Sequence, residues 1–194
     1  MIDPISTTPD GAMSVGATNW RGGVQATEHL LSLGHRRLAF VGAPTASLPG
    51  GERLAGFRTA LESGGLDPNA PPVTSGTFTY EDGLACIPML RAAGRPTAIF
   101  AASDDVALGV LEAARQVGLR VPQDLSVVGF DDTFAAHAAS PQLTTVRQPL
   151  MQMGRMAMQA AVGGTLAGAR PTPPVQLATT LVARGSTATA PLIS

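Results

Sequence analysis

The sequence contains no lysine and only one cysteine, and both absences exclude classes of function. All 13 basic residues among the 194 are arginines, so this sequence offers no lysine to form a Schiff base or to hold phosphates in a P-loop. The lone Cys86 excludes a disulfide framework and a zinc cluster built from several thiolates. We interpret Cys86 as a small buried hydrophobic residue.

Charge and long apolar runs are also scarce. Charged residues make up 14% of the chain and the formal net charge is −1, which gives no general attraction to nucleic acid backbones. We therefore do not expect this chain alone to bind DNA. The sequence shows neither an uninterrupted run of about 18 apolar residues nor a secretory signal at its start. These absences predict a soluble, cytoplasmic chain with no membrane partner.

Helical and strand patterns alternate from Gly22 onward, separated by Gly, Pro, Asn and Asp. This alternation predicts βαβ units, and hence an α/β fold with a parallel sheet flanked by helices on both faces. Apolar spacing predicts helices over 22–33, 52–63, 104–117 and 150–166. Short apolar runs predict strands over 38–41, 73–77, 97–101, 126–129, 143–146 and 175–183.

The same spacing predicts how the helix residues are arranged. Leu108, Leu111 and Val117 of the third helix should face inward. One side of the first helix should carry Val24, Leu30, Leu31 and Leu33, and one side of the last should carry Leu150, Met153, Met156 and Ala157. Thr79 and Asp82 form a capping box for a further helix, which Pro88 should kink or break in two. We expect the first dozen residues and the tail after Ser186 to be poorly ordered.

Polar and aromatic residues follow the predicted strands, where ligands bind in open parallel sheets. They are Arg53 at the end of the first loop, Phe78, then Ser103, Asp104 and Asp105, then Phe130, Asp131 and Asp132. Carboxylates that accept hydroxyl protons, together with rings that stack on apolar sugar faces, are typical of a sugar site.

Each of these residues also has a purely structural interpretation. Asp104 and Asp132 could simply begin the helices that follow them, and Arg53 could be a solvated residue near a helix start. Phe78 and Trp20 could belong to the core. Asp131, directly after a buried strand, is the hardest to explain without a ligand.

The sequence offers little support for catalysis. The three histidines have neither metal-ligand spacing nor an acid at catalytic spacing, and no nucleophile elbow, dinucleotide fingerprint or Walker loop occurs. The paired aspartates could hold a divalent metal, but neighbouring side chains point in different directions. We therefore expect no metal, no cofactor and no enzymatic activity.

Four longer segments resemble, in order and spacing, the effector-binding core of the LacI/GalR family of bacterial transcription repressors. They are GHRRLAFVGAP, ERLAGFRTAL, RPTAIFAASDDVALGVLEAARQVGLRVPQDLSVVGFDD and SPQLTTVRQPL. The similarity extends over about residues 17–187. It implies a core like that of periplasmic sugar-binding proteins, with the effector held between two subdomains.

The resemblance also implies how the chain is divided. Residues 19–146 and 175–187 would form a C-terminal effector-binding subdomain. Residues 1–18 and 147–170 would be the remnant of an N-terminal one, and 188–194 a tail. The family's DNA-binding headpiece and hinge helix have no counterpart in this sequence, so operator DNA would be bound only through a headpiece outside it.

Carried over position by position, the resemblance assigns effector contacts. Arg53 matches an arginine that contacts the effector, Asp131 a carboxylate that accepts its hydroxyls, and Phe78 an aromatic ring that stacks on some effectors. Ser103 stands where many members have Asn, which puts its contact in doubt, and Trp20 could add a ring at the cleft mouth. The predicted effector is a neutral sugar or polyol.

These expectations favour the sensing domain of a sugar-responsive repressor. The alternative is a sugar-binding protein of a transport system, and an enzyme is a third hypothesis. The family forms homodimers through the face that here carries Leu108, Leu111, Ala138 and Ala139, although Leu108 or Leu111 could instead face the sheet. We also expect helix 150–166 to expose Met153 and Met156, because the N-terminal βα units that would cover it are missing.

Overall fold

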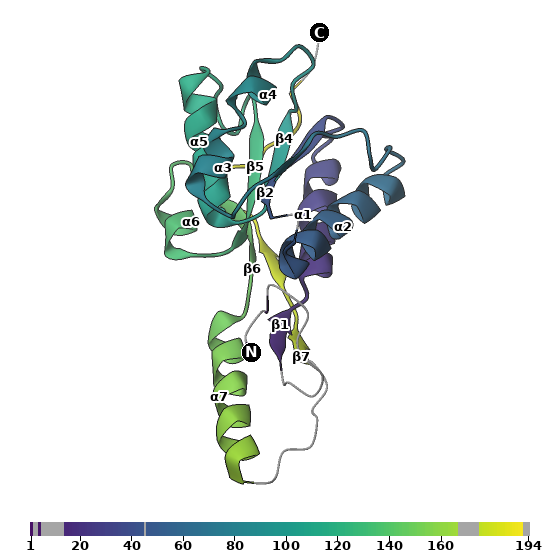
Figure 1. The fold of residues 1–194 in the computed structure, drawn as a ribbon. Helices are drawn as coiled ribbons and strands as arrows, with labels where there is room; N and C mark the ends of the chain where they lie inside the picture. Colours follow the sequence, from purple (N-terminus) through teal and green to yellow (C-terminus); the bar gives the residue numbers. More distant parts are fainter. Residues whose placement is uncertain (2–3, 5–13, 45, 167–174, 192–194) are drawn as a thin grey trace.

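The computed structural model describes residues 1, 4, 14–44, 46–166 and 175–191. Its strands are β1 (Val15–Ala17), β2 (Leu38–Ala43), β3 (Val73–Ser75), β4 (Ala98–Ala101), β5 (Ser126–Asp131), β6 (Thr144–Arg147), β7 (Val175–Leu177) and β8 (Thr180–Val182). Its helices are α1 (Asn19–Ser32), α2 (Leu48–Ser63), α3 (Tyr80–Leu84), α4 (Ile87–Arg91), α5 (Asp104–Gln116), α6 (Phe134–Ala138) and α7 (Leu150–Leu166). Most of them form one unit, and β1, β7 and α7 extend from it (Figure 1).

The main unit is built on a six-stranded sheet with the order β3-β2-β4-β5-β6-β8. Its pairs are parallel except for β6 with β8. Every residue of β2 and β4 is buried, as expected for parallel strands covered on both faces. The predicted α/β fold class, with a parallel sheet flanked by helices, is therefore confirmed.

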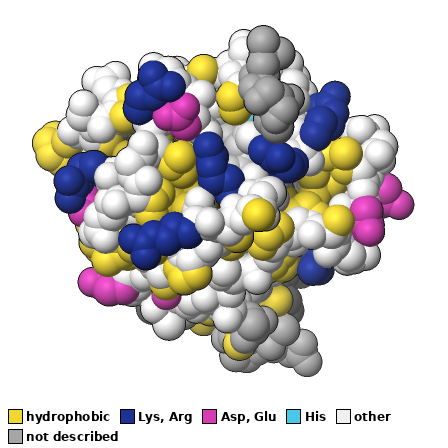
Figure 2. All heavy atoms as spheres, turned by 90° about the horizontal axis from the view of Figure 1, so that it is seen from above, with side chains coloured by type: hydrophobic (Ala, Val, Ile, Leu, Met, Phe, Trp, Pro, Cys, Tyr) yellow, Lys and Arg dark blue, Asp and Glu magenta, His cyan; other side chains and the backbone are white. Residues whose placement is uncertain are grey.

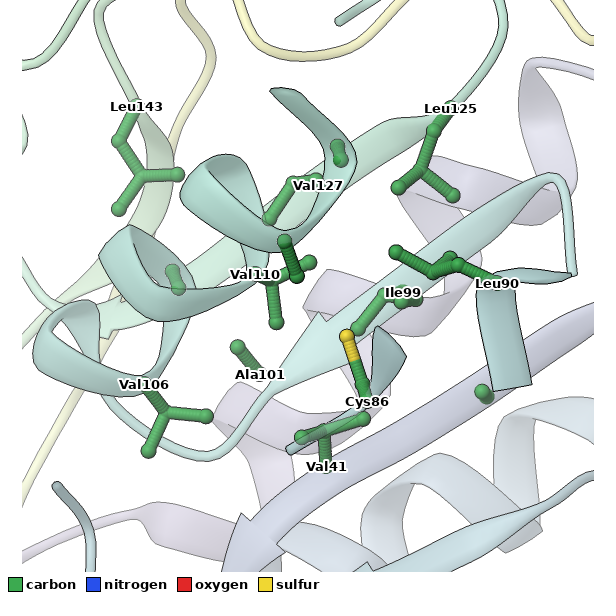
Figure 3. Packing of buried hydrophobic residues seen from close by; sticks show 14 of the residues in the cluster. Val41, Cys86, Leu90, Ile99, Ala101, Val106, Val110, Leu125, Val127 and Leu143 are labelled. Atoms are coloured by element: carbon green, nitrogen blue, oxygen red, sulfur yellow. The ribbon is translucent and has the colours of Figure 1, made fainter. Parts of the chain in front are cut away.

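Alternate residues of the central strands enter two separate cores. Ala39, Ile99 and Val127 pack with α5 and with Cys86 and Leu90 of the α3–α4 region, where most of the side chains are small or branched (Figure 3). Phe40, Phe100 and Phe130 face the other way, toward α1 and α2. Neighbouring rings of this second core lie 5.2 Å and 6.4 Å apart between centroids, within the range of favourable aromatic pairs.

Glycines let the helices cross at very short range. A Cβ atom on Gly56 of α2 would collide with the carbonyl oxygen of Trp20 in α1, and one on Gly23 would meet that of Arg53. Gly83 of α3 and Gly109 of α5 form a second crossing of the same kind. The first crossing holds Arg53 against the start of α1, at the edge of the sheet where the candidate site lies.

The smaller part consists of β1, β7 and α7. β1 pairs with β7 in parallel, whereas the sequence placed 175–187 with the C-terminal subdomain. The predicted single strand over 175–183 is therefore wrong: it is divided between this pair and β8. Met153 is fully buried against Val15 and Ala17, so the expectation that it would be exposed is also wrong. The exposed apolar residues of α7 include Leu150, Met151, Met158 and Val162, so Leu150 does not share the buried position of Met153.

Two of the predicted helix faces are rotated. In α1 the fully covered positions are on the glycine side and include Gly22, Gly23 and Ala26, while Val24, Leu31 and Leu33 are only half-buried. In α5 the sheet is contacted by Val106, Val110 and Ala113, and Leu108, Leu111 and Val117 lie at the margin. Smaller side chains occupy the inner face because these helices lie close to their neighbours.

The predicted helix cap and the predicted helix break are both present. The capping box of Thr79 and Asp82 is present, and the chain breaks before Pro88 into α3 and α4. The prediction that the chain after Ser186 is poorly ordered is wrong for the first residues of this tail. The amide of Ala188 donates to Ser126 Oγ, and that of Ala190 donates to the carbonyl of Leu33. The first dozen residues lie largely outside the described residues, as do 192–194.

Candidate functional site

A hollow of about 400 Å³ opens at the carboxyl ends of β2, β4 and β5. It is lined by Ser47, Pro49, Arg53, Phe78, Ser103, Asp105, Asp131, Thr133, Gln148 and Leu150. Four of the five residues predicted to contact an effector are thus brought together: Arg53, Phe78, Ser103 and Asp131. The fifth, Trp20, is half exposed near the start of α1 and is not among the described residues that line the hollow.

Arg53 is the most enclosed charged group of the hollow, with a side chain only 5% exposed. Its Nε donates to Asn19 Oδ1 at 2.9 Å and its Nη1 to the carbonyl of Ala102 at 2.7 Å. The guanidinium carbon lies 3.8 Å from the ring centroid of Phe130 and 5.6 Å from that of Phe78. Arg53 therefore joins α2 to the start of α1 and to the end of β4, and the interpretation of a solvated arginine is wrong.

Asp131 is held between a cation and an amide. Its Oδ1 lies 3.6 Å from Arg53 Nη2 and accepts a hydrogen bond of 2.6 Å from Gln148 Nε2. Its side chain is 24% exposed, so the carboxylate remains within reach of a ligand in the hollow. A positioned carboxylate with an exposed edge suits the acceptance of a hydroxyl proton.

Gln148 is a site residue that the sequence analysis missed. It follows β6, is 8% exposed, and lines the hollow. Its buried Oε1 has no hydrogen-bond partner among the described residues, which is costly unless a donor reaches it. Its position just after a strand was the available signal, because the other site residues were found by that same rule.

Three non-glycine residues at this edge have positive φ angles. They are Phe78 with φ 66°, Asp131 with φ 113° and Asp132 with φ 60°. For Phe78 and Asp131, such backbone angles cost about 1 to 3 kcal/mol each and persist only where the surroundings impose them. The two strand ends therefore present these side chains in an imposed conformation.

Ser103 and Asp104 have structural roles. Ser103 Oγ accepts from the amide of Val106 as the N-cap of α5 and donates to the carbonyl of Phe78. Asp104 is fully buried and accepts from the amide and hydroxyl of Thr133 and from the hydroxyl of Thr145. Burial raises the pKa of Asp104, while these hydrogen bonds act to lower it. Asp104 therefore fixes the loop after β5, and does not line the hollow.

Asp132 points away from the hollow into a cationic cluster. It accepts hydrogen bonds from Arg147 and Arg184, and His137 lies 3.4 Å away. Although burial raises the pKa of Asp132, the bonds from the two arginines lower it below its usual value. Asp132 does not begin α6, whose N-cap is Thr133.

Two further findings concern the described part of the chain. No group of three or more His, Cys, Asp or Glu side chains there is arranged to hold a metal ion. None of its helices combines the length and apolar character needed to cross a membrane.

The face predicted to pair with a second copy carries a shallow hollow of about 470 Å³. Leu108, Leu111 and Ala139 line it, together with Tyr80 and Pro141. Leu108 and Leu111 are both half-buried, and Ala138 is exposed. The four residues therefore reach the surface, although the covered inner face of α5 is formed by others.

Residues 27–187 match the family described as periplasmic binding protein-like domain. The chain belongs to this family. As a periplasmic binding protein-like domain, it resembles regulators of transcription in particular, and the resemblance to LacI/GalR regulators is confirmed. It is 40% identical over 153 residues to the HTH-type transcriptional regulator CelR of Thermobifida fusca, covering 78% of this chain and 45% of that protein. It is 41% identical over 134 residues to DegA of Bacillus subtilis, covering 69% and 40%.

Solved structures agree with this assignment. The complex of the transcriptional regulator CelR with cellobiose superposes on the domain with a TM-score of 0.88 at 37% identity, over 95% of this chain and 57% of that one. A LacI family regulator from Enterococcus faecium with bound ribose gives a TM-score of 0.88 at 26% identity, over 94% and 68%. The domain spans about half the length of the curated relatives it matches.

Proposed function

We propose that the domain senses a neutral sugar or polyol on behalf of a transcription repressor. The observation that carries the proposal is the hollow at the strand ends, where the Asp131 carboxylate, the Gln148 amide and the Arg53 guanidinium converge beside Phe78. Carboxylate and amide oxygens accept hydroxyl protons, and an aromatic ring covers an apolar sugar face. The sugar-bound relatives, one with cellobiose and one with ribose, support the same class of ligand.

The charges of the hollow favour a neutral ligand over a phosphorylated one. The single arginine that lines it is paired with Asp131, and Asp105 adds a second carboxylate. A phosphate group would therefore meet net negative charge, which raises the cost of binding. The Oε1 of Gln148 would accept a hydrogen bond from a sugar hydroxyl, because it has no donor within the described part of the chain.

Binding would act on transcription by bringing two subdomains together around the ligand. In this proposal, the unit built on the six-stranded sheet forms one wall, and β1, β7 and α7 belong to the other. DNA is contacted by a headpiece outside this chain, in the cytoplasm, and the domain catalyses no reaction. The transport alternative has less support, because the relatives described above are regulators.

Calorimetry on the complete regulator would test the effector. We expect cellobiose, ribose or a related neutral sugar to bind, and Asp131→Asn and Gln148→Ala each to weaken binding by about tenfold or more. Glu81→Gln, an exposed change outside the hollow, should leave it unaltered. Tight binding of a phosphorylated sugar with none of its neutral form would contradict the proposal. So would micromolar binding by the present chain alone, because half of a two-sided cleft encloses too little of the ligand.

The proposal includes a homodimer formed through Leu108, Leu111, Ala138 and Ala139. A twofold interface would place this face against its own copy, and its shallow hollow offers apolar residues for packing beside the Glu112–Arg115 ion pair. Light scattering across micromolar concentrations should detect the dimer, and Leu108→Arg should dissociate it. Met151→Arg changes an exposed apolar residue of α7 instead. If only this second variant dissociated the dimer, the interface would lie on α7.

A further inference from the structure

We propose a second ligand site at the opposite end of the main sheet, which takes a small carboxylate with an apolar body. The site is a pocket of about 250 Å³ formed where β2, β3 and β4 begin. Leu38 is the first residue of β2, and Pro72 and Pro96 come shortly before β3 and β4. Because β2 has six residues, roughly 20 Å separate this pocket from the candidate effector site. It is therefore a distinct site.

Arg37 supplies the observation that points to a ligand. Its side chain lines the pocket, and its buried Nε has no hydrogen-bond partner among the described residues. Because protein atoms cover Nε and Arg37 is otherwise partly exposed, a ligand would meet the guanidinium at its remaining nitrogens. A carboxylate there would supply the charged partner that the described residues do not provide. Its backbone is fixed, because the carbonyl of Arg37 accepts from the amides of Thr97 and Ala98.

A second guanidinium lies beside the first. Arg36 Nη1 donates to the carbonyls of Leu31 and His35, which holds this cation at the end of α1. Neither Arg36 nor Arg37 has a carboxylate within ion-pair distance in the described part of the chain. The arginine side of the pocket therefore carries positive charge that no nearby carboxylate of the described residues neutralises.

Arginines are frequent on the surrounding surface. Figure 2 looks down on this end of the molecule and shows arginine side chains distributed across it between hydrophobic patches, with acidic side chains beside them and toward the edges. Arg91 and Arg95 come from the segment that leads into β4. An anion would be attracted to this face before it entered the pocket.

The rest of the lining explains why the ligand needs an apolar body and carries one charge. Leu38, Leu66, Pro72 and Pro96 provide apolar surface, which a bare inorganic ion would leave unused. Asp67 lies on the lining too, with Oδ1 accepting from the amide of Asn69, and it would repel a second negative charge. The small volume suits a single ring or a branched chain, below the size of drug-like ligands.

Calorimetric titration of the chain with phenylacetate at pH 7 and low salt would test this site. We expect saturable binding in about the millimolar range, since one charge-assisted contact and a small apolar area are available. Phenylacetamide, a neutral molecule of almost the same shape, should bind at least about tenfold more weakly. Equal binding of the two compounds would overturn the assignment of a carboxylate.

Variants locate the binding on the protein. Arg37→Gln should weaken phenylacetate binding by about tenfold or more, and Asp67→Asn should strengthen it, because it removes a like charge. Arg91→Gln removes the same charge as Arg37→Gln from an exposed residue outside the lining, and should have little effect. Unchanged binding in Arg37→Gln, or equal loss in Arg91→Gln, would reject the pocket. Ala70→Glu, at an exposed position of the lining, offers a further check and should prevent binding without disturbing the fold.

Discussion

Replacing Arg53 by methionine should lower the stability of the domain far more than an ordinary arginine substitution. Methionine keeps most of the apolar stem beside Phe130 but removes the donors to Asn19 and Ala102 and the ion pair with Asp131. Two buried acceptors that lose a charged donor cost about 1 to 2 kcal/mol each. The lost contact of the cation with the Phe130 ring adds about 1 kcal/mol. The expected loss in the free energy of unfolding is therefore about 4 kcal/mol.

Urea unfolding followed by circular dichroism measures this loss. With a slope of about 2 kcal/mol per molar, the midpoint should fall by about 2 M. Arg58→Met is the matched control, because Arg58 is an exposed arginine of the same helix; it should change stability by at most about 0.5 kcal/mol. In a double-mutant cycle, Arg53→Met and Asn19→Ala should be coupled by about 1 kcal/mol.

A loss below about 1 kcal/mol for Arg53→Met would refute this reasoning. It would mean that the bonds to Asn19 and Ala102 are replaced by water at no cost, and that Arg53 serves the ligand alone. The expected result instead gives Arg53 two roles. Effector affinity measured in its variants would then contain a contribution from the altered hollow, so Asp131 and Gln148 are the better positions for measuring ligand contacts.

Three further predictions concern pH, packing and thiol chemistry. Burial lowers the pKa of His35, so the unfolded chain binds a proton at this residue more readily than the folded chain does. The contribution of neutral His35 to the free energy of unfolding should therefore be fully present above about pH 6.5 and should fall as the pH drops below it. His35→Asn should flatten this part of a urea-midpoint profile. Gly56→Val should cost about 3 kcal/mol, because its side chain meets the Trp20 carbonyl, whereas Gly51→Ala, with open space around it, should stabilise α2 by up to about 1 kcal/mol in the same assay. Burial raises the pKa of Cys86 to about 12, so a thiol reagent should label it only after urea unfolding, and rapid labelling of the folded chain would contradict this.

The sheet could be predicted because its strands are apolar on both faces. Phe40 and Val41, or Ile99 and Phe100, have no polar alternation between them, which is the pattern of a parallel strand covered by helices on each side. Pro88 and the capping box of Thr79 act through their immediate neighbours, so their effects were predictable from the sequence. Such local signals do not depend on how distant segments meet.

Helix faces and the second sheet depend on distant segments, and there the predictions failed. Large apolar residues such as Leu108 were assigned to the core, but α5 approaches the sheet so closely that Val110 and Ala113 fit instead. Met153 is buried because β1 pairs with β7, two strands separated by more than half of the chain. No periodicity within helix 150–166 carries that information.

The site was predicted in part for the same reason. Phe78 and Asp131 follow predicted strands closely, and Arg53 comes at the end of the loop after another, all of which the sequence displays. The ring beneath the Arg53 guanidinium belongs to Phe130, the last residue but one of β5, and Gln148 follows β6. The sequence placed Phe130 at the ligand edge but could not show that its ring lies beneath Arg53, and Gln148 was not considered, because the partners of both lie on other elements.

The positive φ angles of Phe78 and Asp131 set a conflict between heat resistance and recognition. Glycine would adopt both backbone conformations without strain, but it would also remove the Phe78 ring from the core that it packs against and the Asp131 carboxylate from the buried Arg53. A laboratory selection for thermostability alone should therefore enrich glycine only where the relieved strain exceeds these lost contacts, and such proteins would lack a ring or a carboxylate in the hollow. A selection that also demanded a transcriptional response to the effector should retain both residues. Comparing the outcomes of the two selections would therefore reveal which strained positions the protein keeps for binding rather than for folding.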